Sequence, residues 1–561
     1  MEIVRRKVPA SAHALAAAGI LPVLARIYAA RGIEGVAELD HRLAALPSFA
    51  TLKNIDLAAQ RLCRAIAAGE KIVIVADYDA DGATACAIGL RGLRSFGADV
   101  DFIVPNRFEF GYGLTPEIVA LAAQLSPRLL VTVDNGIASV EGVAAAAARG
   151  IDVLITDHHL PGAELPSPAI IVNPNQHGCA FPSKHIAGVG VMFYVLTATR
   201  ALLRVQGAFR LRPEPNLAHL LDLVALGTVA DVVRLDQVNR IFVMQGLARI
   251  RAGRAQPGVA ALFAVAGRDP ARASVYDLGF VAGPRLNAAG RLADMSLGIA
   301  CLIAEDAGQA LSLATQLDRL NQDRREVEAA MQEEALAEID GIAAGEQSSL
   351  CLYRADWHQG VVGIVASRLK DRFHRPAIVF ARGGNGELKG SGRSIAGFHL
   401  RDALDLVSKR APEIISKFGG HAFAAGLTIA EEMLPRFTAA FEEVAREQLT
   451  PAQLQRTYDS DGVLASGDLT LDLAGTLCQC VWGQGMPAPT FDDLFDVEGA
   501  RVVGDKHMRM TLRRGDERFD AILFQRTDAL PPRIHAAFHP AINEWQGVAS
   551  LELVVDHWLP G

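Results

Sequence analysis

The sequence predicts a multi-domain α/β protein, and three observations support this fold class. Short apolar runs alternate with helical patterns between residues 71 and 157, as in a parallel sheet covered by helices on both faces. Residues 305–340 form one long charged helical pattern, which is typical of a connector between domains. Beyond residue 450, short alternating runs are separated by glycine-containing turns, which indicates a small β-barrel or sandwich.

The composition is that of a folded protein of several domains. The chain has 561 residues, of which 50% are hydrophobic and 21% are charged, and this balance excludes a wholly disordered or collagen-like chain. At roughly 150 residues per domain, the length suggests about three or four domains. The net charge of −8 gives no indication of a nucleic-acid partner, so such a function must rest on local sites.

Cysteine usage and hydropathy predict a cytoplasmic protein without a membrane segment. The seven cysteines are odd in number and form no pair of CxxC units, which favours free cytosolic thiols. No apolar run approaches the roughly 20 residues that a membrane helix needs. Arg5-Arg6-Lys7 and the alanines after it are similar to a signal peptide, but His13, Pro22 and Arg26 interrupt that stretch.

The first sheet is predicted from strands and helices in regular succession. The expected strands are 71–76, 101–104, 129–133 and 151–156, and the expected helices are 83–97 and 138–149. A further helix begins at Thr115-Pro116-Glu117, which offers an N-cap, a proline at the first helical position and an acid in the first turn. The continuous apolar character of the strands indicates burial on both faces.

A second α/β pattern and a β-rich segment follow the long helix. Gly308 is the only glycine in that helix up to residue 340, and proline is absent from it. Thr450-Pro451 marks the expected junction before the β-rich segment. The expected elements are strand 349–353, helix 360–372 and strand 377–381, and then strands 498–503, 508–513, 519–524 and 549–555.

Acidic residues follow three strands of the first sheet. Strand 71–76 is followed by residues 77–82 (DYDADG), strand 129–133 by 134–136 (DNG), and strand 151–156 by 157–159 (DHH). The carboxyl ends of parallel strands meet at one edge of the sheet, where ligands bind. We therefore expect five aspartates and two histidines in one crevice, namely Asp77, Asp79, Asp81, Asp134, Asp157, His158 and His159.

This combination of side chains favours a pair of divalent cations. Clustered carboxylates repel one another and raise each other's pKa unless cations compensate them. Carboxylate and imidazole ligands without thiolates suit Mn²⁺ or Mg²⁺ better than zinc or copper. Two such ions about 3.5–4 Å apart, bridged by a shared aspartate, are the usual arrangement for phosphoester hydrolysis.

Other interpretations exist for each acidic segment taken alone. An Asp-x-Asp loop is commonly a turn or a helix cap, Asp157 could cap a helix, and the histidine pair could be structural. An EF-hand is excluded because residues 83–88 offer no acids. Asp231 lies in the apolar segment 217–235, and the residues alone leave open whether it is a metal ligand or an N-cap.

The chain resembles the DHH phosphoesterase family, named for the sequence at 157–159, and within it the single-strand-specific 5′→3′ exonucleases. The resemblance covers roughly residues 45–561. It rests on ADYDADG at 76–82, PNRFEFGYGL at 105–114, VDNG at 133–136, TDHH at 156–159, ALGTVADVVRL at 225–235, GPRLNAAGR at 283–291, DWHQGVVGIVASRL at 356–369, GSGRS at 390–394 and FGGHAFAAG at 418–426.

The resemblance implies both a domain order and a ligand set. The implied parts are an N-terminal helical segment (1–49), a parallel-sheet DHH domain (50–304), a long connecting helix (305–345), a smaller α/β DHH-associated domain (346–449) and a C-terminal OB-like β-barrel (450–561). The implied metal ligands are Asp79, Asp81, Asp134, His158 and Asp231, with His159 next to the metals, either as a catalytic group or as a group that supports the ligands. Many members carry a histidine where this chain has Val75, so Asp77 is a candidate ligand in its place.

Several basic and polar residues match the family's motifs and could bind phosphate. Arginine forks match phosphate oxygens, small residues allow a close approach, and a helix N-terminus favours anions. Each of these residues could equally belong to an ordinary turn or a surface ion pair. The candidates are Arg107, Arg285, Asn287, Arg291, His358, Ser391, Arg393 and His421.

The implied function is single-stranded-DNA exonuclease activity in recombination and repair. The resemblance implies that Arg107, Ser391 and Arg393 take the 5′ phosphate, that mononucleotides are released stepwise, and that Mn²⁺ or Mg²⁺ is the cofactor. It also implies a single-strand-binding protein and a helicase as partners, and we expect a monomer. The alternatives are another DHH enzyme acting on short RNA, cyclic dinucleotides or pyrophosphate, and a non-catalytic single-strand-binding protein.

Overall fold

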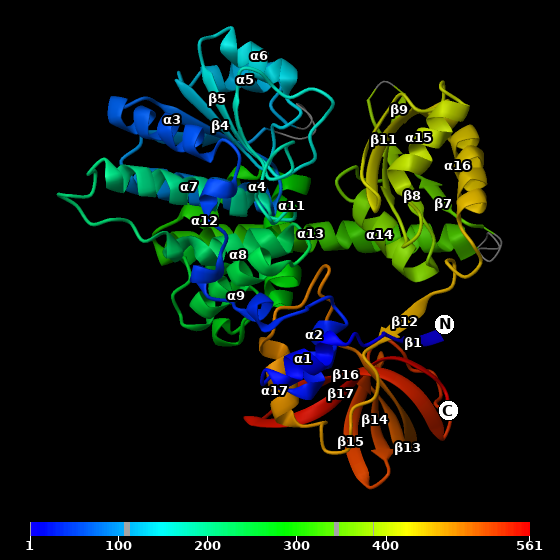
Figure 1. Cartoon of the computed structure of the whole chain (residues 1–561). Coiled ribbons are helices and arrows are strands. Elements are labelled where there is room, and N and C mark those ends of the chain that lie inside the picture. The colour runs from blue at the N-terminus through cyan, green and yellow to red at the C-terminus, as the bar shows by residue number, and fades with distance from the viewer. Residues whose placement is uncertain (1, 106–112, 341–346, 385) are drawn as a thin grey trace. The chain divides into compact units, whose positions relative to one another are not determined.

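The computed structural model describes residues 2–105, 113–340, 347–384 and 386–561, which form two compact units. The larger unit consists of Ile3–Arg319 and Asp459–Gly561, and the smaller unit contains Leu320–Tyr458. Each unit has its own sheet and hydrophobic core (Figure 1).

The larger unit contains the predicted parallel sheet, with strand order β3-β2-β4-β5-β6. All four pairings are parallel, and the register aligns Ala76 with Val133 and Val133 with Thr156, so the carboxyl ends of β2, β4 and β5 lie together. The strands are β2 (Ile72–Ala76), β3 (Val100–Ile103), β4 (Leu129–Val133), β5 (Asp152–Thr156) and β6 (Ile170–Val172). The parallel-sheet prediction is confirmed.

Helices cover both faces of this sheet (Figure 1). On one face, α5 (Pro116–Ala123) and α6 (Val140–Ala147) bury Val73, Val75 and Leu130. On the other face lie α3 (Ile55–Ala68), α4 (Ala80–Ser95) and α7 (Gly188–Val205). Within the described residues, α7 alone is long and apolar enough to cross a membrane, and two thirds of it is buried in the fold.

The remaining helices of the larger unit complete the frame around the sheet edge. They are α8 (Leu221–Ala230), α9 (Gln237–Arg251), α10 (Pro257–Val265), a π-helical segment η6 (Asp277–Ala282) that continues into α11 (Gly283–Leu292), and α12 (Ser296–Ile303). The long predicted helix is α13 (Ala307–Asp340), and the boundary between the two units falls within it.

The smaller unit is built on a mixed sheet of order β10-β11-β9-β8-β7. Only β7 and β8 pair in parallel, and the other pairs are antiparallel. The elements are β7 (Leu350–Tyr353), α14 (Val362–Phe373), β8 (Ala377–Arg382), β9 (Glu387–Arg393), α15 (Leu400–Arg410), β10 (Lys417–Gly420), β11 (Ala424–Ala430) and α16 (Leu434–Gln448).

The C-terminal strands close into a barrel of order β13-β14-β15-β17-β16, as predicted. They are β13 (Phe491–Val503), β14 (His507–Arg514), β15 (Glu517–Leu523), β16 (Arg533–Trp545) and β17 (Val548–Pro560), preceded by α17 (Leu471–Gln479). The sequence did not predict β16, whose run is interrupted by Pro540, and β17 pairs with β15 in parallel. The barrel core contains Phe491, Phe495 and Phe538.

The N-terminal segment packs on the barrel rather than standing alone. Helices α1 (Ser11–Ala17) and α2 (Pro22–Ala29) follow β1 (Glu2–Arg5), and Leu24 and Ile27 of α2 belong to the barrel's core. Arg31 and Asp461 form an ion pair of 2.7 Å in which both side chains are almost fully buried. The five-part division implied by the resemblance stays a prediction.

Asp461→Ala is expected to destabilise the larger unit by about 3–5 kcal/mol, because it leaves the buried Arg31 guanidinium without its counter-charge. Trp482 lies 5.4 Å from that guanidinium and reports the transition through its fluorescence during urea unfolding. Asp40→Ala, which removes the partner of the exposed Arg42, is the matched control and should leave the midpoint almost unchanged. Equal midpoints for Asp461→Ala and the wild type would contradict this role.

Candidate metal centre

The turn after β2 carries acids that also start helix α4. Asp79 is the N-cap of α4, and its Oδ1 accepts hydrogen bonds from the backbone N–H groups of Asp81 and Gly82 at 2.9 and 3.0 Å. The cap interpretation is therefore correct for Asp79, and it fixes the position of this carboxylate at the sheet edge. Asn287 of α11 accepts a hydrogen bond from Ala80 N–H at 2.8 Å and holds the same turn in place.

Asp81 lies in the first turn of α4 and points at the N-terminus of α7. Its two carboxylate oxygens accept hydrogen bonds from Gly188 N–H at 2.6 Å and Val189 N–H at 2.9 Å. A helix N-terminus stabilises a negative charge, so this contact partly compensates the complete burial of Asp81. In the sequence, only the glycines at 188 and 190 hint at this contact, because they allow a close approach.

Asp134 follows β4 in a left-handed backbone conformation with φ of 62°. Such a conformation is uncommon outside glycine, and in a non-glycine residue it commonly belongs to a functional site. The carboxylate is buried, and it packs against Gly188, where a Cβ atom would lie 2.6 Å from Asp134 Oδ1. The α7 N-terminus therefore contacts both Asp81 and Asp134.

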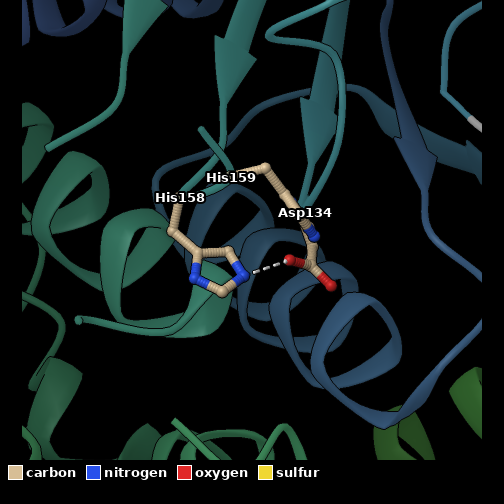
Figure 2. A group of neighbouring side chains, drawn as sticks. All are labelled: Asp134, His158 and His159. Carbon is tan, nitrogen blue, oxygen red and sulfur yellow. Dashed lines mark ion pairs between the residues drawn. The ribbon is translucent and has the colours of Figure 1, made fainter. Parts of the chain in front are cut away.

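Two histidines follow β5, and Figure 2 shows the ring of His158 facing the carboxylate of Asp134. His158 Nε2 lies 3.1 Å from Asp134 Oδ1, 3.4 Å from Asp231 Oδ2 and 3.9 Å from Asp81 Oδ2. Asp231, the C-cap of α8, therefore joins the cluster. Burial and the neighbouring His159 lower the pKa of His158 to about 4, so its imidazole is neutral and keeps a free lone pair for a ligand.

Asp157 organises the loop and orients His159. Its Oδ1 accepts hydrogen bonds from the backbone N–H groups of His158 and His159 and lies 2.8 Å from His159 Nδ1, while Oδ2 accepts from Ile137 N–H. Although burial opposes the charged forms, this pairing lowers the pKa of Asp157 and raises the pKa of His159 to about 9. The pairing with Asp157 therefore favours the protonated form of His159, whose side chain remains 44% exposed.

Among the described residues, three groups of donor atoms lie at this edge of the sheet, and within each group the atoms are within 4.8 Å of one another. The groups are Asp77 with Asp79 and Asp134, Asp81 with His158 and Asp231, and Asp134 with His158 and His159. Asp134 belongs to two of these groups, as a bridging ligand would. Burial raises the pKa of Asp134 and Asp231 well above their usual range, and the neighbouring acids Asp81 and Asp79 add to the shift.

The donor set fits divalent cations that prefer oxygen and imidazole ligands. Burial, followed by the charge of Asp79, raises the pKa of Asp81 to about 7, so the cluster is electrostatically costly when ionised alone. His158 Nε2 is buried, and among the described residues it makes no hydrogen bond of good geometry. Val75 belongs to the hydrophobic core on the α5–α6 face, so it supplies no ligand to this site.

Gly188→Ala is expected to weaken Mn²⁺ binding by about 10- to 100-fold, because the added Cβ must displace Asp134 or the α7 N-terminus. Isothermal titration with Mn²⁺ measures this change. Gly499→Ala is the matched control, since a Cβ at that position meets nothing within 4 Å. Unchanged Mn²⁺ affinity in Gly188→Ala would show that the close packing around Asp134 is not needed for binding.

A second cluster, in the smaller unit, surrounds Arg393 at the end of β9. Arg393 Nη1 donates hydrogen bonds to Gly392 O at 2.8 Å and Ser391 Oγ at 3.2 Å, and burial lowers its pKa. A Cβ at Gly363, in the first turn of α14, would lie 2.8 Å from Ser391 Oγ and 3.0 Å from Arg393 Nη2. A partly buried guanidinium beside a helix N-terminus is suited to an anion.

Two histidines of the smaller unit also match the predicted site residues. His358 precedes α14, and its Nδ1 accepts a hydrogen bond from Gly360 N–H at 3.0 Å. Burial lowers the pKa of His358, which favours its neutral form. His421 lies between β10 and β11, and its Nδ1 accepts from Phe423 N–H.

The other predicted phosphate ligands have different surroundings. Arg285 is largely buried, pairs with Asp318 at 2.8 Å and donates to Val281 O, so much of its hydrogen-bonding capacity is already used. Arg291 lies in the last turn of α11. Asn287 accepts a hydrogen bond from Ala80 N–H and so positions the turn that carries Asp79 and Asp81. Arg107 lies outside the described residues.

Comparison with known proteins agrees with this architecture. Three family models match the chain: the DHH family N-terminal domain at residues 71–228, the DHHA1 domain at 346–447 and the RecJ OB domain at 460–557. The single-stranded-DNA-specific exonuclease RecJ of Dickeya dadantii is 50% identical over 552 residues, and that of Escherichia coli is 47% identical over 553 residues. Both matches cover 96% of this chain and 96% of the relative.

Solved structures of RecJ proteins also match this chain. The crystal structure of RecJ in complex with Mn²⁺ from Thermus thermophilus matches with a TM-score of 0.82 and 30% identity, covering 100% of this chain and 79% of that chain. A crystal structure of exonuclease RecJ bound to manganese matches with a TM-score of 0.61 and 35% identity, covering 73% of this chain and 98% of that chain. From its sequence relatives and its domain order, the chain belongs to the RecJ family of DHH single-stranded-DNA-specific exonucleases.

Proposed function

We propose that this chain degrades single-stranded DNA from its 5′ end to mononucleotides by phosphodiester hydrolysis that depends on two Mn²⁺ or Mg²⁺ ions. The observation that carries the proposal is the convergence of acidic side chains and a neutral imidazole at one sheet edge. The ligands would be Asp79, Asp81, Asp134, His158 and Asp231. Asp77 would supply the further ligand that many family members take from a histidine at the position of Val75.

The chain's own groups have distinct roles in this proposal. Bound divalent cations would supply a hydroxide at neutral pH and neutralise the leaving oxygen. His159, whose protonated form is favoured by Asp157, lies beside the acidic cluster, where it would bind a non-bridging phosphate oxygen or donate a proton to the leaving group. Asn287 and the α7 N-terminus would keep the carboxylates in position before substrate arrives.

The smaller unit would recognise the phosphorylated 5′ end. Arg393 and Ser391 offer a fork and a hydroxyl beside the first turn of α14, and His358 precedes that helix. In this proposal Arg107 also takes the 5′ phosphate, and Arg285, Arg291 and His421 add further contacts to the strand. The barrel would bind the strand with basic and aromatic side chains, as OB folds commonly do.

Digestion of a single strand labelled at either end tests the proposal. With Mn²⁺ present, a 5′ label should be released at once as a mononucleotide, whereas a 3′ label should stay on progressively shorter strands. With a chelator in place of Mn²⁺, neither label should be released. Early release of the 3′ label, or hydrolysis of a dinucleotide in preference to the long strand, would contradict the proposal.

We further propose that the protein works in the cytoplasm, in recombination and repair, as a monomer that cooperates with a single-strand-binding protein and a helicase. The exonuclease activity of its family supports this setting, because a helicase exposes the strand that such an enzyme consumes. Light scattering during gel filtration measures the oligomeric state, and a mass of twice 59.8 kDa would contradict the monomer.

A further inference from the structure

A cavity of about 800 Å³ lies within the larger unit between the DHH core and the barrel. Its walls come from segments far apart in the sequence: the end of α8 and the residues after it, the 274–280 segment, α17 with the 482–490 loop, and the edges of β16 and β17. The lining is mostly apolar, and the volume is within the range of small-molecule sites.

Two aromatic side chains on the cavity wall are exposed to solvent. Tyr276 is 57% exposed and Phe280 is 71% exposed. Their rings are stacked, with centroids 5.0 Å apart and an interplanar angle of 21°. The two residues are four positions apart, Phe280 lies within the π-helical segment η6, and such segments are frequent at functional sites. An exposed aromatic stack of this kind is a suitable surface for a planar ligand.

One arginine lies beside this aromatic pair. The guanidinium of Arg268 lies 6.0 Å from the centre of the Tyr276 ring, and its Nε lies 3.5 Å from Asp277 Oδ1. The lining carboxylate of Asp556 is paired with His539 at 3.0 Å, so its charge is partly compensated. Positive charge beside stacked aromatic rings is the combination that binds single-stranded nucleic acid.

The cavity wall adjoins the candidate metal centre. Val232, the residue after Asp231, lines the cavity, is exposed, and has a φ of 60°, which is strained for a β-branched residue. The helix that carries the aromatic pair continues directly into α11, whose Asn287 holds the acidic turn. A ligand at the cavity would therefore lie next to the reacting part of the molecule.

We propose that Tyr276 and Phe280 form a stacking platform for an unpaired base of the substrate strand, with Arg268 near the adjoining phosphates. This inference deepens the proposed function and rests on it, because the occupant is the same single strand. Stacking on the platform requires a base whose face is free, so the site tolerates any base but excludes one whose faces are covered by its neighbours inside a duplex. The platform positions the strand and takes no part in bond cleavage.

Replacing one base at a time by an abasic nucleotide tests the platform. The Kd is measured for strands of about sixteen nucleotides that differ only in the position of the abasic nucleotide. Divalent cations are left out so that the protein does not hydrolyse the strands during the measurement. For the wild type, the abasic substitution at one or two positions should weaken binding about tenfold. The double variant Tyr276→Leu/Phe280→Leu should bind the intact strand with a Kd that is higher by a similar factor. For this variant, an abasic nucleotide at the same one or two positions should not raise the Kd further. Tyr276→Phe/Phe280→Tyr should behave like the wild type.

The outcomes separate this inference from the proposed function. The platform is overturned if the leucine variant binds the intact strand as tightly as the wild type. It is also overturned if the loss of affinity caused by the leucine substitutions adds to the loss caused by the abasic nucleotide at every position. Hydrolysis is measured separately with Mn²⁺, where the leucine variant should show a raised KM and an unchanged kcat. A wild type that binds with the expected abasic pattern but does not hydrolyse the strand would overturn the proposed function and leave the platform in place.

Discussion

Asp134→Asn is expected to lower the kcat for hydrolysis of single-stranded DNA by about a thousand-fold or more while the chain stays folded. Residues that merely support a metal ligand contribute about 10- to 100-fold, so the loss of a ligand shared by two ions should exceed that range. Asparagine tolerates the left-handed backbone that Asp134 adopts, so the substitution removes the charge without new backbone strain. Single-turnover digestion in Mn²⁺ measures the effect.

The same variant gives a second result that a merely misfolded protein would not give. Burial and the nearby carboxylates raise the pKa of Asp134, so its ionised form costs folding free energy when no cation is bound. Without metal, Asp134→Asn should therefore unfold at a higher temperature than the wild type, and Mn²⁺ should stabilise it less. Asp222→Asn, another fully buried aspartate that accepts from Gln256 N–H, is the matched control and should keep normal activity. Normal turnover by Asp134→Asn would refute the bridging role.

Arg393→Ala is expected to remove about ten- to a hundredfold of the preference for a 5′-phosphorylated strand over an unphosphorylated one. Hydrogen bonds to a charged partner contribute about 1.5–3 kcal/mol, and the guanidinium lies beside Ser391 and the first turn of α14. The ratio of kcat/KM for the two strands measures this preference. Arg393→Lys should give an intermediate ratio, because it keeps the charge but loses the fork.

The matched control is Arg382→Ala, an exposed arginine of the same sheet that pairs with Glu431. It should leave the ratio unchanged. If Arg393→Ala lowered kcat/KM equally for both strands, Arg393 would contribute to general strand binding or to folding, and the 5′-phosphate pocket would have to be sought elsewhere.

The sequence predicted the parts of the fold that depend on local pattern. The apolar strands β2, β4 and β5 were identified because burial on both faces leaves a continuous apolar run, and the acids after them converge because parallel strands end at one edge. Strand β6 was missed because three residues between loops carry no periodic signal. In β16 the alternating pattern is interrupted at Pro540.

The roles of individual site residues depend on partners that are distant in the sequence. The ion pair of Arg285 with Asp318 joins residues 33 positions apart, and the contact between Asn287 and Ala80 spans 207 positions. The left-handed backbone of Asp134 and the hydrogen bonds of Asp157 to His159 follow from loop conformations that no local pattern fixes. The aromatic pair at 276 and 280 gave no motif signal, because its significance lies in its exposure.

The most direct measurement is anomalous diffraction from crystals of the wild-type protein soaked in Mn²⁺. Two anomalous peaks are expected about 3.5–4 Å apart, both within reach of Asp134 and surrounded by Asp79, Asp81, His158 and Asp231. Manganese bound only elsewhere in an enzyme that is active in the crystal, or a single peak that Asp134 does not contact, would refute the two-metal site.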